Sequence, residues 1–174
     1  MYCKEAPDIS ALLLHSWTAQ NEKNIAQSTP ANKQIHVKTI PKGSTGLIQP
    51  LDVFGFRIWK QFVRYFYDLV LLYDYPMNIH LRNNLLKIQC VTHNQMSSPR
   101  FPNMWRYSWF KCGYTDVKPS CFVNPVEYCY KQDSIACTCD VCESETVARC
   151  AWCKQSLCLD HFFVNVHYCT NYSE

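Results

Sequence analysis

Eight cysteine and histidine side chains crowd into residues 139–169 as four close pairs. The pairs are Cys139 and Cys142, Cys150 and Cys153, Cys158 and His161, and His167 and Cys169. Two residues between ligands let one tight turn aim both side chains at a single ion, and four such ligands complete the tetrahedral shell of a structural Zn2+. Eight ligands therefore predict two closed zinc sites with no position left open for water.

The order of the pairs predicts how they combine. The third pair follows the second after only four residues, which is too soon for one local site to close before the next begins, so we expect the sites to interleave. One site would use Cys139, Cys142, Cys158 and His161, and the other would use Cys150, Cys153, His167 and Cys169. A segment of this length buries too little apolar surface to offset its chain entropy, so bound metal must supply the folding free energy.

Disulfides are the alternative use of these cysteines, and the chain has an even total of 12. However, the N-terminal apolar run from Ala11 to Leu14 is too short for the core of a signal peptide, so nothing indicates an oxidising compartment. Disulfides would also leave the two histidines unexplained. Cys137 lies two residues before Cys139 and could replace it as a ligand, although the spacing favours Cys139.

Length and charge bound the remaining functions. The 174 residues are enough for one ordinary domain beside the metal-binding segment, and only 4 glycines argue against a glycine-rich phosphate loop. No run of uncharged apolar residues is long enough to span a membrane, so we expect a soluble, intracellular chain. Residues 1–130 hold 14 Lys and Arg against 8 Asp and Glu, whereas residues 131–174 hold 3 against 6. The basic first part favours an anionic partner such as nucleic acid.

The N-terminal pattern predicts a strand, a helix and a second strand. The continuous apolar run Ala11–Leu14 predicts a strand that ends at His15, and Ile35–Ile40 alternates apolar and polar residues as a second strand does. Between them, Thr18 is a candidate N-cap for a short helix over residues 19–27. Two strands joined through a helix indicate a parallel crossover unit.

Three further helices are expected. Apolar residues recur every three or four positions over Val53–Tyr73, with Asp52 as N-cap. Two more helices are predicted over Asn78–Val91 and Arg100–Cys112, the latter capped by Ser98. Residues 117–136, which include two prolines, are expected to form a linker.

A basic stripe follows the helical spacing of the long helix. Arg57, Lys60 and Arg64 share one face, which could track a phosphate backbone or could simply be a solvated helix face. Trp105 and Trp109 are four residues apart, which is more typical of a helix face packed in a core than of a platform for stacking bases.

Two stretches carry a family resemblance: LLLHSW at residues 12–17 and IPKGSTGLIQPLD at residues 40–52. Together they resemble the later half of the catalytic domain of DDE superfamily endonucleases, the mariner and pogo group of transposases. In that family the apolar strand ends in a catalytic aspartate, and a P-x-G-T-T-x-x-x-Q-P-L-D stretch carries the third catalytic acid. The resemblance covers about residues 5–116. The Cys/His segment is itself similar to the cross-brace zinc tail of piggyBac-type transposases, and its spacing is close to that of B-box modules, which bind protein.

The DDE resemblance implies a ribonuclease H-like fold in which three carboxylates hold two divalent cations, such as Mg2+, for cleavage of DNA. Asp52 matches the third acid, but His15 stands at the position of the second. A neutral imidazole adds no negative charge to a site for Mg2+, which prefers oxygen ligands. The first acid has no counterpart in this sequence, where Glu5 and Asp8 are the remaining candidates. We therefore expect a catalytically inactive chain.

These inferences combine into one expected architecture and function. The fold would be α/β, with an incomplete ribonuclease H-like unit of two parallel strands plus helices over residues 1–116, the linker over 117–136, and a zinc cross-brace module over 137–170. The function would be that of a transposase-derived, nuclear protein that binds nucleic acid and holds two structural zinc ions. The alternative is a zinc-dependent adaptor that binds protein in the manner of a B-box and has no role with DNA.

Overall fold

The computed structural model describes residues 7–17, 22–131, 136–169 and 171–172. The expectations for Glu5 and Thr18 lie outside these residues. In chain order the elements are β1 (Ile9–Leu14), α2 (Glu22–Ser28), β2 (Gln34–Thr39), α3 (Thr45–Ile48), the π-helical turn η1 (Leu51–Gly55), α4 (Phe56–Leu72), α5 (Arg82–Met96), α6 (Pro102–Lys111), α7 (Pro125–Tyr130), β3 (Ala148–Arg149), β4 (Ser156–Leu157) and the π-helical turn η3 (Asp160–Val164). Of the helices that the structure describes, none is long and apolar enough to cross a lipid bilayer.

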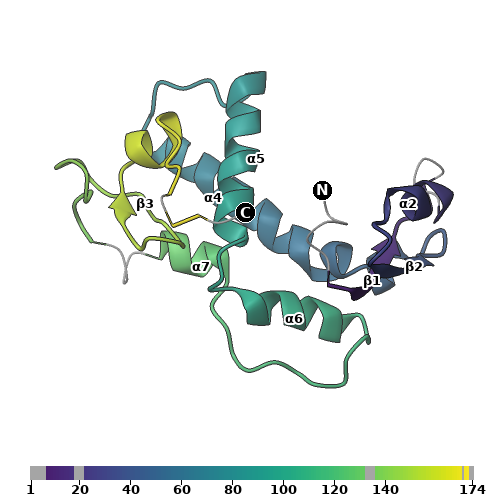
Figure 1. Ribbon diagram of the computed structural model, residues 1–174. Helices are drawn as coiled ribbons and strands as arrows, with labels where there is room; N and C mark the ends of the chain where they lie inside the picture. The colour runs from purple at the N-terminus through teal and green to yellow at the C-terminus, as the bar shows by residue number, and fades with distance from the viewer. Residues whose placement is uncertain (1–6, 18–21, 132–135, 170, 173–174) are drawn as a thin grey trace.

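Strands β1 and β2 pair in parallel, and α2 lies between them in the chain, as the sequence predicts. The register places Leu12 opposite Val37. Burial in this unit is shallow, because Leu14 and Ile40 are the buried hydrophobic residues among those described before residue 50, while Ile9 is 71% exposed. Figure 1 shows β1, α2 and β2 together at one end of α4, away from the other helices. The structure thus contains a two-stranded parallel sheet within a mixed α/β chain.

Turn η1 leads directly into helix α4, and together they cover the long helix that the sequence predicts. The apolar stripe is confirmed, since Ile58, Phe62 and Phe66 are buried along it. The expectation that Asp52 caps this helix is wrong. The cap residue is Pro50, so the exposed side chain of Asp52 lies within the first turn.

Helix α6 packs against η1 through a close contact at Gly55. A Cβ atom at Gly55 would lie only 3.0 Å from Cζ3 of Trp105, so the absence of a side chain there lets the indole approach the backbone. Trp105 is half-buried, but Trp109 is 42% exposed, so the expectation that both pack in a core is wrong for Trp109. The N-cap of α6 is Phe101, not Ser98 as expected.

Helix α7 lies in the segment that we expected to be a linker, and this expectation is wrong for residues 125–130. Oδ1 of Asn124 accepts from the backbone N–H of Glu127 at 3.0 Å, and Oε2 of Glu127 accepts from the N–H of Asn124 at 3.3 Å. This capping box, with Pro125 at the first helical position, begins the helix. Cys129 and Tyr130 are buried at its end.

Helix α5 begins four residues later and ends five residues later than expected. Its buried face includes Ile88 and Val91, but also the polar residues Thr92 and Gln95. The hydroxyl of Thr92 donates to the carbonyl of Ile88 at 2.7 Å, which satisfies it within the helix. Gln95 instead makes its contacts with the C-terminal segment.

One hydrophobic core joins the helices to the C-terminal segment. Buried residues of α4, α5 and α7 form a continuous cluster with Leu157, Phe162 and Phe163. The ring centroids of Phe66 and Phe163 lie 4.5 Å apart, and those of Phe62 and Tyr130 lie 4.7 Å apart. The short antiparallel pair β3–β4 and the turn η3 therefore pack on the helices instead of standing apart from them (Figure 1).

Candidate metal centres and the basic helix

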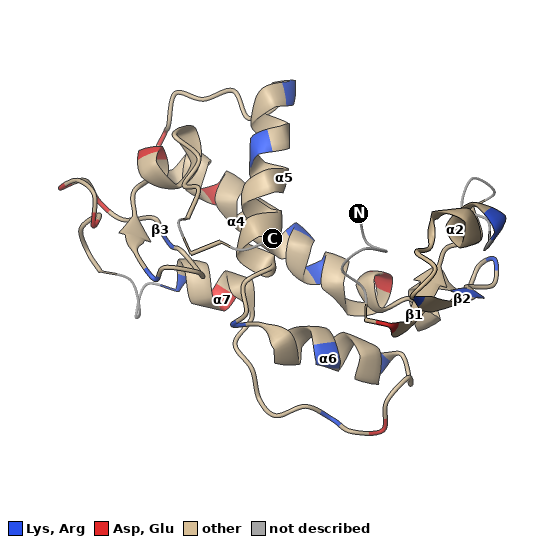
Figure 2. Ribbon diagram, viewed as in Figure 1, with Lys and Arg blue, Asp and Glu red and all other residues tan. Residues whose placement is uncertain are grey.

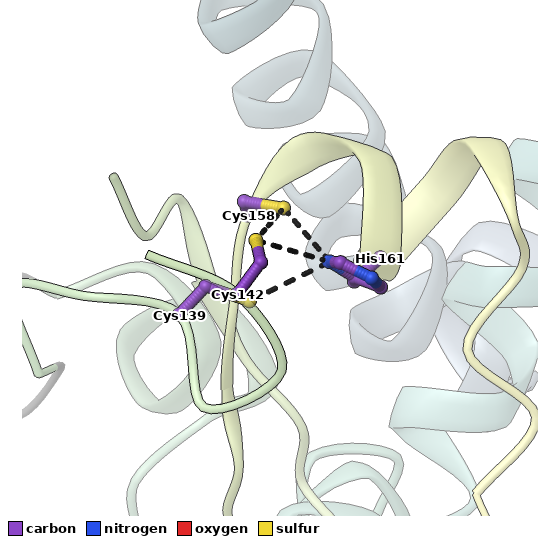
Figure 3. Close-up of side chains that lie close together, drawn as sticks. All are labelled: Cys139, Cys142, Cys158 and His161. Atoms are coloured by element: carbon purple, nitrogen blue, oxygen red, sulfur yellow. Dashed lines mark hydrogen bonds between the residues drawn. The ribbon is translucent and has the colours of Figure 1, made fainter. Parts of the chain in front are cut away.

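The first group of candidate ligands consists of Cys139, Cys142, Cys158 and His161. Two come from the turn that precedes β3, one directly follows β4, and His161 lies in η3. Figure 3 shows the side chains converging, with the three sulfur atoms turned toward the ring of His161. Nδ1 of His161 lies 3.2 Å from the sulfur of Cys158, 3.4 Å from that of Cys142 and 3.7 Å from that of Cys139.

The second group consists of Cys150, Cys153, His167 and Cys169. Cys150 and Cys153 enclose the turn between β3 and β4, and the sulfur of Cys153 lies 3.3 Å from Nε2 of His167. Two residues with left-handed backbone border this group: Lys154 at φ 71° and Val166 at φ 44°. A β-branched residue rarely adopts this conformation, so the packing around Val166 must hold the bend that precedes His167.

Both groups have the dimensions of a tetrahedral zinc site. Bonds of about 2.3 Å to sulfur and about 2.0 Å to nitrogen give ligand separations of about 3.8 Å between sulfurs and about 3.5 Å between sulfur and nitrogen. The observed separation of the Cys142 and Cys158 sulfurs is 3.7 Å, and all ligand atoms within a group lie within 4.8 Å of one another. These are the two groups that interleaved spacing predicts, and their donor set and geometry are compatible with Zn2+.

Without a bound cation, the thiolate form is disfavoured at Cys158 and Cys153 but favoured at Cys139. Burial, together with neighbouring thiols, raises the pKa of Cys158 to about 11 and that of Cys153 to about 12. Burial also raises the pKa of Cys139, but hydrogen bonds from neighbouring backbone N–H groups outweigh it and lower the pKa to about 6. Burial lowers the pKa of His167, which favours the neutral ring that a metal requires. A divalent cation would favour the thiolate at every one of these cysteines, because it supplies the opposite charge.

The positions of the cysteines distinguish those that lie in a candidate ligand group from those that do not. Cys137 is exposed and belongs to neither group, so Cys139 is the residue that the fold places with the other ligands. None of the cysteines in the described residues forms a disulfide.

Helix α5 holds the turn of the second group, which the sequence did not predict. The buried side-chain oxygen of Gln95 accepts from the backbone N–H of Ala151 at 2.6 Å, and its Nε2 lies 3.8 Å from the sulfur of Cys150. Ser98 donates to the carbonyl of Ala151 at 3.0 Å, and the indole of Trp152 donates to the carbonyl of Asn94 at 2.7 Å. Nothing in the spacing of Gln95 distinguishes it from an exposed helical glutamine.

The residues at the expected catalytic positions are not gathered into a metal site. His15, Asp52 and Asp8 are all exposed. Among the described residues, the groups of three or more His, Cys, Asp or Glu that could hold one ion are the two cysteine and histidine groups.

The basic stripe on α4 divides between two surfaces. Arg57, Lys60 and Arg64 are all exposed, and Figure 2 shows blue bands of Lys and Arg along the helix. Arg57 and Arg64 line a groove against α7, where Asp68 and Glu127 offset their charge. Lys60 and Arg64 line a second hollow toward α5, and no acidic residue is among the described residues that line it.

Comparison with known proteins finds a similarity in the C-terminal part of the chain. Residues 109–169 match the family described as the Tc5 transposase C-terminal domain. This segment begins near the end of α6, includes α7 and contains all eight candidate ligands. No curated protein and no solved structure matches the chain. The segment that holds both groups of candidate ligands is therefore similar to the C-terminal domain of a transposase.

Proposed function

We propose that this transposase-derived chain binds nucleic acid through α4 and that two structural zinc ions hold the fold on which α4 depends. The observation that carries the proposal is the shared core. The segment with the two ligand groups packs directly on the buried face of α4, whose opposite face carries the basic residues. A closed site with four protein ligands leaves no coordination position for a substrate. The zinc ions would therefore influence nucleic-acid binding only by holding α4 in place.

Metal analysis tests the zinc part of the proposal. Protein purified with its thiols reduced should hold about two Zn2+ per chain, one for each four-ligand group. Cys158→Ser and Cys169→Ser each remove one ligand from a different group and should each lower the content by about one ion. Cys137→Ser, in an exposed cysteine outside both groups, is the matched control. A content well below one ion per chain in the unmodified protein would contradict the proposal.

Salt-dependent binding tests the role of α4. If Arg57, Lys60 and Arg64 contact phosphates, changing all three to Ala should weaken binding to any DNA sequence. The slope of log K against log salt should fall by about 0.9 for each duplex contact that is lost. An unchanged slope would identify these residues as a solvated helix face.

For catalysis, we propose that the chain neither cuts nor joins DNA strands. His15 stands where the DDE resemblance requires the second acid, and two-metal chemistry depends on several carboxylates acting together. The exposed Asp52 alone would hold Mg2+ weakly. The assay is cleavage of a supercoiled plasmid with Mg2+ or Mn2+ by the unmodified chain, His15→Asp and Asp52→Ala. Cleavage by the unmodified chain that is lost in Asp52→Ala would refute the proposal.

The origin of the first part is also a proposal. The β1–α2–β2 unit and the helices up to residue 116 would derive from the later half of a ribonuclease H-like DDE domain, and residues 137–170 from a cross-brace module. Support comes from the parallel pairing of β1 with β2 and from the position of Asp52 at the start of the long helix. With DNA as partner, the expected location is the nucleus.

A protein-binding adaptor is the second candidate. A groove of about 470 Å3 between α4 and the segment before β3 is lined by Tyr65, Tyr73 and Tyr130 together with Glu145. Tyrosines are enriched at protein-binding surfaces relative to the rest of the protein surface. Because the ligand-bearing segment shares its core with α4, the adaptor must be tested on the whole chain. Absence of DNA binding at low salt by the zinc-loaded chain would favour this candidate.

A further inference from the structure

Two neighbouring hollows lie on the side of α4 that faces α5, and the end of the C-terminal segment lines one of them. One has a volume of about 420 Å3 and the other of about 290 Å3, and they share Trp59 and Gln89 in their walls. We call the two hollows together the α4–α5 groove. The charged and aromatic residues that line it include Trp59, Lys60, Arg64, Tyr67, Tyr168 and Tyr172.

The charge of the α4–α5 groove has a single sign. Lys60 and Arg64 are exposed on its α4 side, and among the described residues that line it there is no Asp or Glu. The groove on the other side of α4 differs, because Asp68 and Glu127 line it beside Arg57 and Arg64. A polyanion should therefore bind more readily in the α4–α5 groove than in the groove between α4 and α7.

Aromatic rings make up much of the remaining wall. The indole nitrogen of Trp59 donates to Oε1 of Gln89 at 2.8 Å, which fixes the ring at the centre of the groove. Tyr67 lies in the wall beside the two cations, and Tyr168 is 70% exposed on the opposite side. Cations beside exposed rings are the features with which proteins bind single strands, because every base has a flat face that can stack on an aromatic ring.

We infer that the α4–α5 groove binds an unpaired nucleic-acid strand, with phosphates at Lys60 and Arg64 and bases stacked on Trp59 and Tyr168. The inference rests on the proposed nucleic-acid-binding function and specifies its ligand. In a duplex the bases already stack on one another, so a paired strand could use the cations but not the rings. Single strands should therefore bind more tightly here than duplexes of equal length.

The second ligand group supports the far wall of the groove. Tyr168 lies between the ligands His167 and Cys169, and the backbone N–H of Tyr172 donates to the carbonyl of Cys169 at 3.0 Å. The rings of Tyr168 and Tyr172 pack edge to face with centroids 5.7 Å apart. Any change that frees His167 and Cys169 should displace this wall.

The test measures binding of zinc-loaded full chain to a labelled oligothymidine of about 15 nucleotides and to a duplex of the same length. Tyr168→Ala should weaken single-strand binding by about tenfold and duplex binding by less than about twofold, because it removes a stacking partner but no charge. Lys60→Ala should weaken both. Tyr168→Phe keeps the ring and should bind as the unmodified chain does.

Matched controls lie on other surfaces. Tyr114→Ala removes an exposed tyrosine after α6, and Lys42→Ala removes an exposed lysine before α3; neither residue lines the groove. Both variants should bind the single strand normally. Melting curves and zinc content of every variant should match those of the unmodified chain, so that a loss of binding reports the groove.

Each contrary result has a distinct meaning. Single-strand binding that survives Tyr168→Ala, or that falls no more than duplex binding does, would overturn this inference while leaving the proposed function intact. Absence of binding to both oligonucleotides would refute the proposed function itself. If a polyglutamate peptide of about 15 residues competes as strongly as oligothymidine does, the groove binds acidic protein segments and the inference of an unpaired strand is overturned.

Discussion

The β1–α2–β2 unit and the region from α4 onward bury their apolar residues to very different extents. In the first, the described buried hydrophobic residues are Leu14 in β1 and Ile40 just after β2. In the second, helices α4, α5, α6 and α7 and the ligand-bearing segment contribute to one continuous core. The sequence is apolar in both regions. Burial therefore depends on packing partners that are distant in the chain. Helix α4 packs on η3, whereas β1 and β2 have no comparable partner among the described residues.

This difference has a physical basis in the number of packed layers. A pair of strands is marginal alone, because its edges and faces stay open to water. The second region gains a helical layer on one side of the core and two candidate metal centres on the other. A structural zinc ion contributes about 10–16 kcal/mol of apparent binding free energy, which exceeds the stability of many whole domains.

The largest expected effect is that of removing metal. Chelation should unfold α4, α5 and α7 together with the ligand-bearing segment, because all contribute to one core. Amide hydrogen exchange should show a loss of protection in α4 and α5, with little change in β1 and β2. Protection of α5 that persists after complete removal of zinc would show that the helices fold without the ligand-bearing segment.

A core truncation should affect the two regions unequally. Phe163→Ala removes a ring that is 1% exposed and packs on Phe66, and it should lower the free energy of unfolding by about 3–5 kcal/mol. Ile9→Ala, in β1, should change it by no more than about 0.5 kcal/mol. Urea unfolding followed by circular dichroism measures both. Equal losses would mean that β1 contributes to the main core.

Gln95 provides a sharper test of how α5 joins the second ligand group. Gln95→Leu leaves the backbone N–H of Ala151 buried without its acceptor and should cost about 1–3 kcal/mol. Gln61→Leu, on the exposed face of α4, is the matched control and should be close to neutral. Gln95→Leu should also release zinc to a chelator faster than the unmodified chain does. An unchanged rate of zinc release would show that the contact between Gln95 and Ala151 contributes to packing of α5 but not to retention of zinc.

The smallest expected effect comes from a contact at the rim of the core. A hydrogen bond from its hydroxyl to the carboxylate of Asp160, followed by burial, raises the pKa of Tyr75 from 10 to about 12. The contact should therefore stabilise the fold fully below pH 10, and its contribution should be lost as the pH rises toward 12. Tyr75→Phe should remove at most about 1 kcal/mol. Burial also raises the pKa of Tyr130, so absorbance titration should find one fewer late-ionising tyrosine in the variant than in the unmodified chain.

Sequence patterns predicted what is local. Ligand spacing predicted both groups of four, because each pair is set by one turn and the interleaving by the distance between pairs. The parallel crossover and the apolar stripe of α4 followed from periodicity. Helix α7 is not among the predicted helices, although Asn124 and Glu127 form its capping box and Pro125 stands at its first position. Proline is common in linkers as well as at the first position of a helix, so the two prolines alone do not distinguish the two.

The rest depends on contacts between distant residues. Helix α5 continues to Met96 with Thr92 and Gln95 buried, and the buried Gln95 finds its partners in Ala151, Cys129 and Cys150. Similarly, the division of the basic stripe follows from the positions of α5 and α7 on either side of α4. Helical periodicity places side chains on a face but does not say which element packs beside it.

The contact between Phe66 and Phe163 has a consequence for synthesis of the chain. The two residues meet in the core but are separated by almost a hundred positions, so the ribosome delivers the second ring long after the first. At about 5–20 residues per second, α4 must wait roughly 5–20 s with its apolar stripe uncovered. Ligands His167 and Cys169 emerge later still. During this interval the apolar stripe of the nascent helix is open to other apolar surfaces, and the proposed zinc sites can close only after Cys169 has emerged.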